Sequence, residues 1–228
     1  MISTLRDSTA HVFVDAIDTP ILDELDAHHL LRVLRVTTSD PVTVSDGKGN
    51  WRSCRVGPDA TVEVTSETFV QAQPISKLTV AFSLVKGDRP EWTVQKLTEI
   101  GIDEIILLAA TSRSVVRWDK DRAGKNISRL RRVAREAAMQ SRRTWLPNVR
   151  DVTEMSAIPE LFIADPNGAP LDATHCTIAI GPEGGFSEQE SGVGAGLVSL
   201  GDTVLRAETA AISAAVLMSD HRRKRNQL

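Results

Sequence analysis

The chain has 228 residues, of which 41% are hydrophobic, and a formal net charge of −3. This composition is typical of a globular protein and excludes a membrane-spanning one, because no apolar run reaches the roughly 20 residues that a spanning helix needs. The N-terminus lacks a basic segment followed by an apolar one, so we expect a cytoplasmic protein. The two cysteines, Cys54 and Cys176, and the five histidines follow no metal-ligand or redox spacing, and we expect no metal site.

The first part of the chain, residues 1–72, is expected to be a small domain built as a β-barrel. Alternating apolar residues and turn signals predict short strands over residues 11–16, 42–45, 51–56 and 60–66. A helix is predicted over residues 22–34, which sets Arg32 and Arg35 three positions apart on one helical face. Two interpretations of these arginines stay open: contact with RNA phosphates, or a solvent-exposed basic edge.

The second part, residues 73–228, is expected to be an α/β domain with a parallel sheet, because strands and helices alternate after Pro74. Strands are predicted over residues 78–85, 104–109, 161–164, 177–180 and 198–200. Helices are predicted over residues 91–100, 125–142 and 207–218, and the first of them should stop at Gly101. A basic tail is expected at residues 221–225.

Positive charge is concentrated in one segment, although the chain as a whole is acidic. Between Asp119 and Arg143 there are nine Lys or Arg residues and three acids. Clustered basic charge is typical of nucleic-acid binding, whereas the alternative for such a run is a solvated helix face. The excess of arginines over acids within the segment favours contact with RNA.

Glycines break the chain sharply after the strand predicted at residues 177–180. The sequence Gly181-Pro-Glu-Gly-Gly-Phe-Ser-Glu-Gln-Glu190 allows positive φ and the close approach of a ligand to the backbone. Ser187 and Glu190 have the spacing of a capping box, which begins a helix. Together these signals describe a ligand site at the carboxyl end of a strand. An ordinary tight turn is the alternative.

A second stretch repeats this arrangement, since Leu200-Gly-Asp-Thr-Val-Leu-Arg-Ala-Glu-Thr-Ala210 is again a glycine break followed by a helix start. The two stretches closely resemble the motifs of the SPOUT methyltransferases, and within them the RsmE family, which methylates N3 of a uridine in 16S ribosomal RNA. Ala207 and Thr203 depart from the family pattern. Weaker matches follow in the right order: Lys86-Gly-x-Arg89, Gln95-Lys96-x-x-Glu99-x-Gly101, Thr111-x-Arg113-Ser114 and Gln140-Ser-Arg142.

The resemblance implies a PUA-like RNA-binding barrel followed by a SPOUT-type parallel sheet, in which a deep C-terminal trefoil knot holds the cofactor. It implies S-adenosylmethionine as the methyl donor, 16S ribosomal RNA in the small ribosomal subunit as the partner, and a homodimer. The cofactor-binding residues expected from the resemblance are Leu161, Ile180, Gly181, Pro182, Glu183, Gly184, Gly185, Leu200, Gly201, Leu205, Glu208, Thr209 and Ala210.

The implied chemistry is attack by a uridine nitrogen on a sulfonium methyl group, and an arginine near the pyrimidine oxygens would stabilise the uridine anion. The catalytic candidates are Arg113, Arg142 and Arg206, with Glu183 a weaker candidate for proton removal. RNA contacts are expected from Arg32, Arg35, Lys86, Arg89, Lys96, Ser114 and Gln140. Stacking on an unpaired base is considered for Trp92, Trp118 and Phe186, against simple core packing.

Two other functions compete. One is a methyltransferase of the same fold that acts on another RNA position, such as a ribose 2′-oxygen in tRNA. The PUA-like first unit and the Glu-Thr-Ala form of the last motif argue against it. The other is an RNA-binding protein without activity, which the intact motif glycines and Arg206 disfavour. A phosphate-loop enzyme is weaker still, because the Gly-x-x-x-x-Gly-Lys-Ser/Thr motif is missing.

Overall fold

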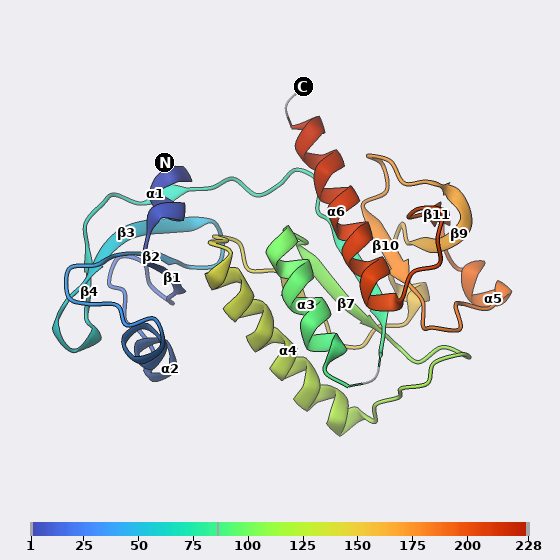
Figure 1. The fold of residues 1–228 in the computed structure, drawn as a ribbon, viewed down its shortest axis with the longest axis horizontal. Coiled ribbons are helices and arrows are strands. Elements are labelled where there is room, and N and C mark those ends of the chain that lie inside the picture. The colour runs from blue at the N-terminus through green and yellow to red at the C-terminus, as the bar shows by residue number, and fades with distance from the viewer. Residues whose placement is uncertain (1, 86, 227–228) are drawn as a thin grey trace. The chain divides into compact units, whose positions relative to one another are not determined.

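The computed structural model describes residues 2–85 and 87–226, and they form two compact units (Figure 1). The first unit comprises Met1–Pro74 together with Glu136–Leu146, and the second comprises Ile75–Arg135 and Pro147–Leu228. No helix in the described part of the chain is both long and apolar enough to cross a membrane.

The first unit is organised around a sheet that has five strands in the described residues. The strands are β1 Ala10–Phe13, β2 Pro41–Ser45, β3 Asn50–Val56, β4 Val62–Val64 and β5 Phe69–Val70. Strands β1 and β2 run parallel, and β3 pairs antiparallel with β2, β4 and β5. A short helix not predicted from the sequence, α1 Ile2–Asp7, precedes β1. The four predicted strands therefore exist, with shifted ends.

The predicted helix over residues 22–34 is shorter and irregular. Helix α2 covers Glu24–His28 and passes into a π-helical turn, His29–Val33. Arg32 lies in that turn, whereas Arg35 lies beyond it with a left-handed backbone, at φ 53°. The expectation that both arginines share one helical face is therefore wrong, because the helix ends before Arg35. Both side chains are exposed.

The segment Glu136–Leu146 completes the first unit, although it follows the second unit's first strands in the chain. Thr144 is fully buried there. Its backbone carbonyl accepts hydrogen bonds from the Gly49 amide at 3.0 Å and the Ser45 hydroxyl at 3.1 Å. The Trp145 indole N–H donates to the backbone carbonyl of Gln71 at 2.9 Å. These contacts attach the segment to the turn between β2 and β3 and to the chain after β5.

The second unit contains a parallel sheet with six strands in the described residues, in the order β11-β9-β10-β6-β7-β8. The strands are β6 Thr79–Ser83, β7 Glu104–Leu108, β8 Asn148–Val149, β9 Phe162–Pro170, β10 Thr177–Ile180 and β11 Gly196–Ser199. Gly168 allows β9 and β11 to pair closely, because a Cβ there would lie 2.4 Å from the Val198 nitrogen. The predicted parallel α/β sheet is confirmed.

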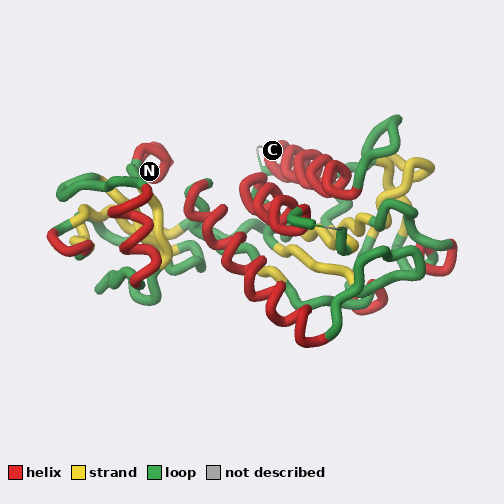
Figure 2. Tube along the Cα trace, turned by 60° about the horizontal axis from the view of Figure 1, so that its bottom comes forward, coloured by secondary structure: helices red, strands yellow, loops and turns green. Residues whose placement is uncertain are grey.

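Three helices pack on one face of this sheet: α3 Arg89–Ile100, α4 Lys120–Gln140 and α6 Ala207–Arg225. Figures 1 and 2 both show α3 and α6 side by side, and they are in contact. The strand residues that face them alternate in sequence, as in Val80 and Phe82 of β6, while Ala81 joins the core on the opposite face. Helix α3 ends at Gly101, whose φ of 106° is left-handed, as the sequence predicts.

The expected basic tail is not a free tail, because α6 continues to Arg225. Arg222 forms an ion pair with Asp103 and donates to the carbonyl of Gly101 at 2.8 Å and to that of Ser76 at 3.3 Å. The basic segment of α4 likewise has acidic partners from elsewhere. Arg129 lies 3.2 Å from Glu91, and Arg131 lies 3.0 Å from Asp151. Ion pairs within the fold therefore neutralise part of the positive charge of this segment.

Candidate active site

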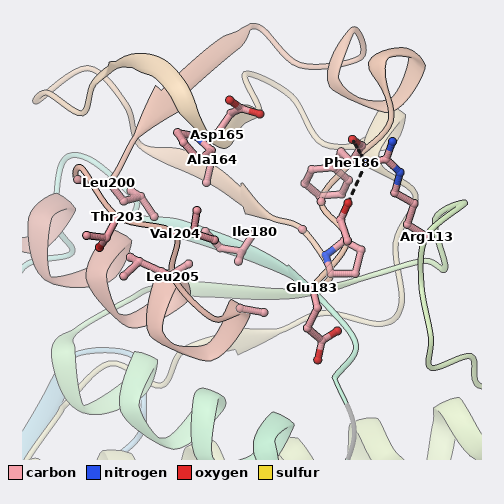
Figure 3. Close-up of a pocket in the computed structure, with 18 residues that line it drawn as sticks. Arg113, Ala164, Asp165, Ile180, Glu183, Phe186, Leu200, Thr203, Val204 and Leu205 are labelled. Carbon is pink, nitrogen blue, oxygen red and sulfur yellow. Dashed lines mark hydrogen bonds between the residues drawn. The ribbon is translucent and has the colours of Figure 1, made fainter.

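A cavity of about 380 Å³ opens beside the middle of β9 and beyond the ends of β10 and β11. Its walls come mainly from four places: residues 164–166 within β9, a first motif loop of residues 181–186 after β10, a second motif loop of residues 200–205 with the start of α6, and Arg113, which follows β7. Carboxyl ends of parallel strands are the usual position of ligand sites in open α/β sheets. Figure 3 shows Arg113 beside Phe186, with Leu200, Thr203 and Leu205 gathered away from them.

Most residues predicted to hold a cofactor line this cavity. They are Ile180, Gly181, Pro182, Glu183, Gly184, Gly185, Leu200, Gly201, Leu205 and Ala210. Gly185 and Gly201 have φ of 69° and 147°, conformations that other residues rarely adopt. The glycines of the two motif loops thus form part of the wall with backbone rather than side chains.

Three predicted cofactor residues do not line the cavity. Leu161 is buried in the core on the face of the sheet opposite the helices. Glu208 and Thr209 lie in the first turn of α6, where Ala207 and Ala210, three residues apart, are the ones that face the cavity. Helical periodicity therefore turns Glu208 and Thr209 away from it.

Arg113 is the predicted catalytic residue that lines the cavity. It belongs to a turn that we call the arginine loop, residues 111–114, which follows β7 and is closed by a hydrogen bond from the Thr111 amide to the Ser114 hydroxyl at 2.8 Å. Its Nη1 donates to the carbonyl of Gly184 at 2.8 Å and to that of Phe186 at 3.4 Å. A guanidinium has five N–H donors in all, so Nε and Nη2 carry donors besides those of Nη1.

The other two catalytic candidates lie elsewhere. Arg142 is in the first unit, where its Nη2 donates to the carbonyls of Ser8 and Thr9 at 2.8 and 3.1 Å. Burial lowers the pKa of its guanidinium. Arg206 is the exposed residue before α6 and does not line the cavity. Arg142 therefore donates to backbone carbonyls of the first unit, and Arg206 is not part of the cavity wall.

Arg89, predicted to contact RNA, joins the two motif stretches. Its Nη1 lies 3.6 Å from a carboxylate oxygen of Glu183 and 3.7 Å from one of Glu208. The other oxygen of Glu208, Oε2, is buried and accepts no hydrogen bond from the described residues. A buried carboxylate oxygen without a donor is costly. The arrangement therefore favours a hydrogen-bond donor, or a cation, next to Glu208.

The remaining RNA-binding candidates occupy diverse positions. Lys96 pairs with Glu99 at 2.8 Å, and Ser114 closes the arginine loop, so both have partners within the fold. Gln140 is the exposed last residue of α4. Lys86 lies outside the described residues. Among the aromatic candidates, Phe186 lines the cavity and Trp92 is 45% exposed.

Sequence reasoning missed several lining residues: Ala164, Asp165, Pro166, Thr203, Val204 and Ala207. Asp165 is the most informative, because it brings a second carboxylate to the cavity in addition to that of Glu183. Its Oδ1 accepts hydrogen bonds from the Asn167 amide and side chain at 2.8 and 3.1 Å. The signal was available: Asp165 and Pro166 come directly after the apolar run at residues 161–164, and an apolar run followed by a polar break is the pattern that marked the other cavity loops.

The parallel sheet and the cavity agree with a class of protein that the matching family models define, an RNA methyltransferase with a PUA domain. A family model described as RNA methyltransferase domain matches residues 71–219, and one described as RNA methyltransferase PUA domain matches residues 22–65. The chain is 32% identical to ribosomal RNA small subunit methyltransferase E of Bacillus subtilis, covering 83% of this chain and 85% of that one. It belongs to the ribosomal RNA small subunit methyltransferase E family, the RsmE family whose motifs its sequence resembles.

Solved structures agree with this assignment. A methyltransferase of Legionella pneumophila in complex with SAM has a TM-score of 0.79 and 26% identity, over 92% of this chain and 96% of that one. Ribosomal RNA small subunit methyltransferase E of Neisseria gonorrhoeae, bound to S-adenosyl methionine, has a TM-score of 0.74 and 26% identity, over 92% and 97% of the two chains. The resemblance to this family and the PUA domain are confirmed.

Proposed function

We propose that this protein transfers the methyl group of S-adenosylmethionine to N3 of a uridine in 16S ribosomal RNA. One observation carries the proposal: a glycine-walled cavity at the strand ends has the guanidinium of Arg113 at one end. Relatives named ribosomal RNA small subunit methyltransferase E support the substrate, and the two neighbours with bound S-adenosylmethionine support the cofactor.

The residues of the cavity fit this cofactor. Ile180, Leu200 and Leu205 offer apolar walls, and the backbone at Gly181 and Gly201 is open to a ligand's polar groups. Two carboxylates, Asp165 and Glu183, complement the positive charge of the cofactor's sulfonium and amino groups. When bound, S-adenosylmethionine supplies a methyl group that a nitrogen nucleophile can accept.

Within this cavity we assign Arg113 the main catalytic role. A uridine nitrogen must lose its proton to become a strong nucleophile, and the resulting negative charge spreads onto the neighbouring carbonyl oxygens. Guanidinium donors that already face this position would stabilise that charge as it develops. Arg113 is held in place by Gly184 and Phe186 through Nη1, which leaves Nε and Nη2 for the base. Glu183, which lines the same cavity, is our candidate proton acceptor.

We extend the proposal to the RNA contacts, the knot and the oligomeric state. Arg32 and Arg35 are exposed on the PUA-type unit, and we propose that they contact the RNA backbone. Arg142 would order the segment that carries it, and Arg206 would contact phosphate. We further propose a barrel in the first unit, a trefoil knot around the motif loops, a homodimer, and a cytoplasmic location with the small ribosomal subunit.

The test is to incubate the protein with methyl-labelled S-adenosylmethionine and small ribosomal subunits that lack the modification, then digest the RNA and identify the labelled nucleoside. Label in 3-methyluridine is the expected result. Label in a ribose-methylated nucleoside would contradict N3 as the acceptor and assign the protein to another RNA position. Absence of label in subunits, naked ribosomal RNA and tRNA would overturn the proposal.

A further inference from the structure

One carboxylate joins the arginine loop to the first motif loop. Glu190 lies in the short helix α5, Glu188–Ser191, and its Oε2 accepts a hydrogen bond from the Ser187 amide at 2.8 Å. Its Oε1 accepts one from the Ser112 amide at 2.6 Å. These two amides belong to segments that follow different strands, β10 and β7. The Glu190 side chain therefore links two loops in addition to capping helix α5.

The residue next to Ser112 is Arg113, so the bridge acts on the backbone that carries the guanidinium. Arg113 itself attaches to the first motif loop through the carbonyls of Gly184 and Phe186. The arginine loop is thus fastened at two points, by its backbone to Glu190 and by its side-chain tip to Gly184. With both ends fixed, the guanidinium has a restricted set of positions at the cavity.

The charge state of Glu190 suits this role. Removal from solvent acts to raise the pKa of the carboxyl group, but the hydrogen bonds from Ser187 and Ser112 outweigh it, and the pKa lies below its usual range. The group is therefore an anion at neutral pH, and hydrogen bonds to an anion are stronger than those between neutral groups.

A helix cap alone does not explain the contact. The capping box requires only Ser187 and Glu190, and both of its hydrogen bonds are present without Ser112. Helix α5 has four residues, and none of them is buried, so stabilising it contributes little to the core. The additional bond reaches a residue 78 positions away in the sequence.

We propose that Glu190 is a positioning residue for Arg113: by binding the amides of Ser112 and Ser187 together, it holds the arginine loop so that the guanidinium faces the methyl-acceptor position. The inference rests on the proposed function, in which Arg113 stabilises the uridine anion. Displacing a positioned catalytic group by about 1 Å costs on the order of 100-fold in rate, so the effect of releasing this bridge should be measurable.

The test variant is Glu190→Gln, which keeps the shape of the side chain. In the amide side chain one of the two oxygens is replaced by an NH2 donor, which faces a backbone amide instead of accepting from it, so one of the two hydrogen bonds is lost. The matched control is Ser187→Ala, which removes the hydroxyl half of the capping box and leaves the Ser112 bond in place. We expect Glu190→Gln to lower kcat by about 10- to 100-fold with little change in cofactor affinity, and Ser187→Ala to stay near the wild-type kcat.

Two further measurements separate positioning from general loss of structure. In an Arg113→Ala background, Glu190→Gln should cause no additional loss of kcat, because it acts through the residue already removed. Hydrogen exchange, measured without RNA, should be faster at the Ser112 amide or the Ser187 amide in Glu190→Gln, and unchanged at the Ser112 amide in Ser187→Ala.

In Glu190→Gln, unchanged exchange at both the Ser112 and the Ser187 amides or an unchanged kcat would overturn the inference. An equal loss in Ser187→Ala, or additive losses with Arg113→Ala, would also overturn it. Failure of the proposed function looks different, since the wild-type protein itself would then label no RNA.

Discussion

The guanidinium of Arg113 donates to the backbone carbonyl of Gly184 at 2.8 Å, and a Cβ at Gly184 would lie 3.4 Å from the Cβ of Arg113. The side chain of the arginine therefore runs across a position where only hydrogen is present. At that distance a methyl group would just fit, whereas the branches of a larger side chain would meet the arginine. The glycine makes room for the arginine as well as for a ligand.

Gly184→Val should therefore displace Arg113 and narrow the cavity. The valine methyl groups would extend beyond the Cβ position into the arginine side chain. We expect the dissociation constant for S-adenosylmethionine to rise by about 10- to 100-fold, the equivalent of 1–3 kcal/mol of overpacking. Isothermal titration calorimetry measures this directly. Unaltered affinity would show that the first motif loop does not hold the cofactor.

A matched control for that variant is Gly124→Ala. Gly124 lies inside α4, and a Cβ there would meet nothing within 4 Å. Replacing a helical glycine by alanine stabilises a helix by about 1 kcal/mol. The control should therefore melt at or above the wild-type temperature and bind the cofactor normally.

Gly168→Ala tests the strand pairing that supports the second motif loop. The added Cβ would lie 2.4 Å from the backbone nitrogen of Val198 and 2.6 Å from the carbonyl carbon of Leu197. Because these are backbone atoms of β11, the strand must shift away from β9. We expect the free energy of unfolding to fall by about 1–3 kcal/mol, and chemical denaturation followed by circular dichroism is the measurement. A fully stable variant would contradict the close pairing of β9 and β11.

Arg222→Met tests the attachment of α6. The side chain of Arg222 is 14% exposed and that of Asp103 is 16% exposed, so removing the cation leaves a largely buried carboxylate without its ion-pair partner. We expect a loss of about 2–4 kcal/mol in the free energy of unfolding. Arg223→Met is the control, because Arg223 is 72% exposed and pairs with Asp220 at the surface. Its loss should stay below about 1 kcal/mol. Equal losses would mean that the Arg222 contacts add nothing.

His11 should make the stability depend on pH. The imidazole is 2% exposed, and burial lowers its pKa to about 4. It contacts the Thr43 hydroxyl at 2.9 Å and the Arg143 carbonyl at 3.1 Å. Between the unfolded pKa of about 6.5 and the folded pKa, His11 is protonated in the unfolded chain but neutral in the folded protein. The contribution of His11 to the free energy of unfolding is therefore fully present above about pH 6.5 and is lost as the pH falls toward the folded pKa. The total loss is on the order of 3 kcal/mol by pH 4.

Urea unfolding between pH 7.5 and pH 4.5 measures this dependence, with His11→Gln as the comparison. The variant removes the titrating group, so its stability should decrease less over the same range. Parallel curves for the two proteins would contradict the assignment of the effect to His11.

Local signals predicted much of the second unit. The strand Thr177–Ile180 and the start of α6 at Ala207 agree with the sequence prediction, because an apolar run and a glycine break mark each of them. Gly101 ends α3 for an equally local reason. Ten of the thirteen predicted cofactor residues line the cavity, since both motif loops are contiguous in sequence.

Other features depend on contacts between segments that are distant in sequence. The hydrophobic periodicity of the sequence does not predict such contacts. Asp165 reaches the cavity because β9 lies between β10 and β11, an order that the sequence does not reveal. The pairing of Arg222 with Asp103 joins residues 119 positions apart. The two-residue strand β8 is too short to produce an apolar alternation. These features needed the three-dimensional arrangement.

The first unit is discontinuous in sequence, because its last segment, Glu136–Leu146, begins some sixty residues after Pro74. During translation, the sheet of that unit emerges well before the chain that supplies the Thr144 and Trp145 contacts. The N-terminal unit must therefore wait for part of the methyltransferase unit to be synthesised before it can finish folding. If the protein folds during translation, the first unit can complete its fold only after residue 146 has been synthesised. This differs from the usual order, in which an N-terminal domain finishes folding before the next domain is made.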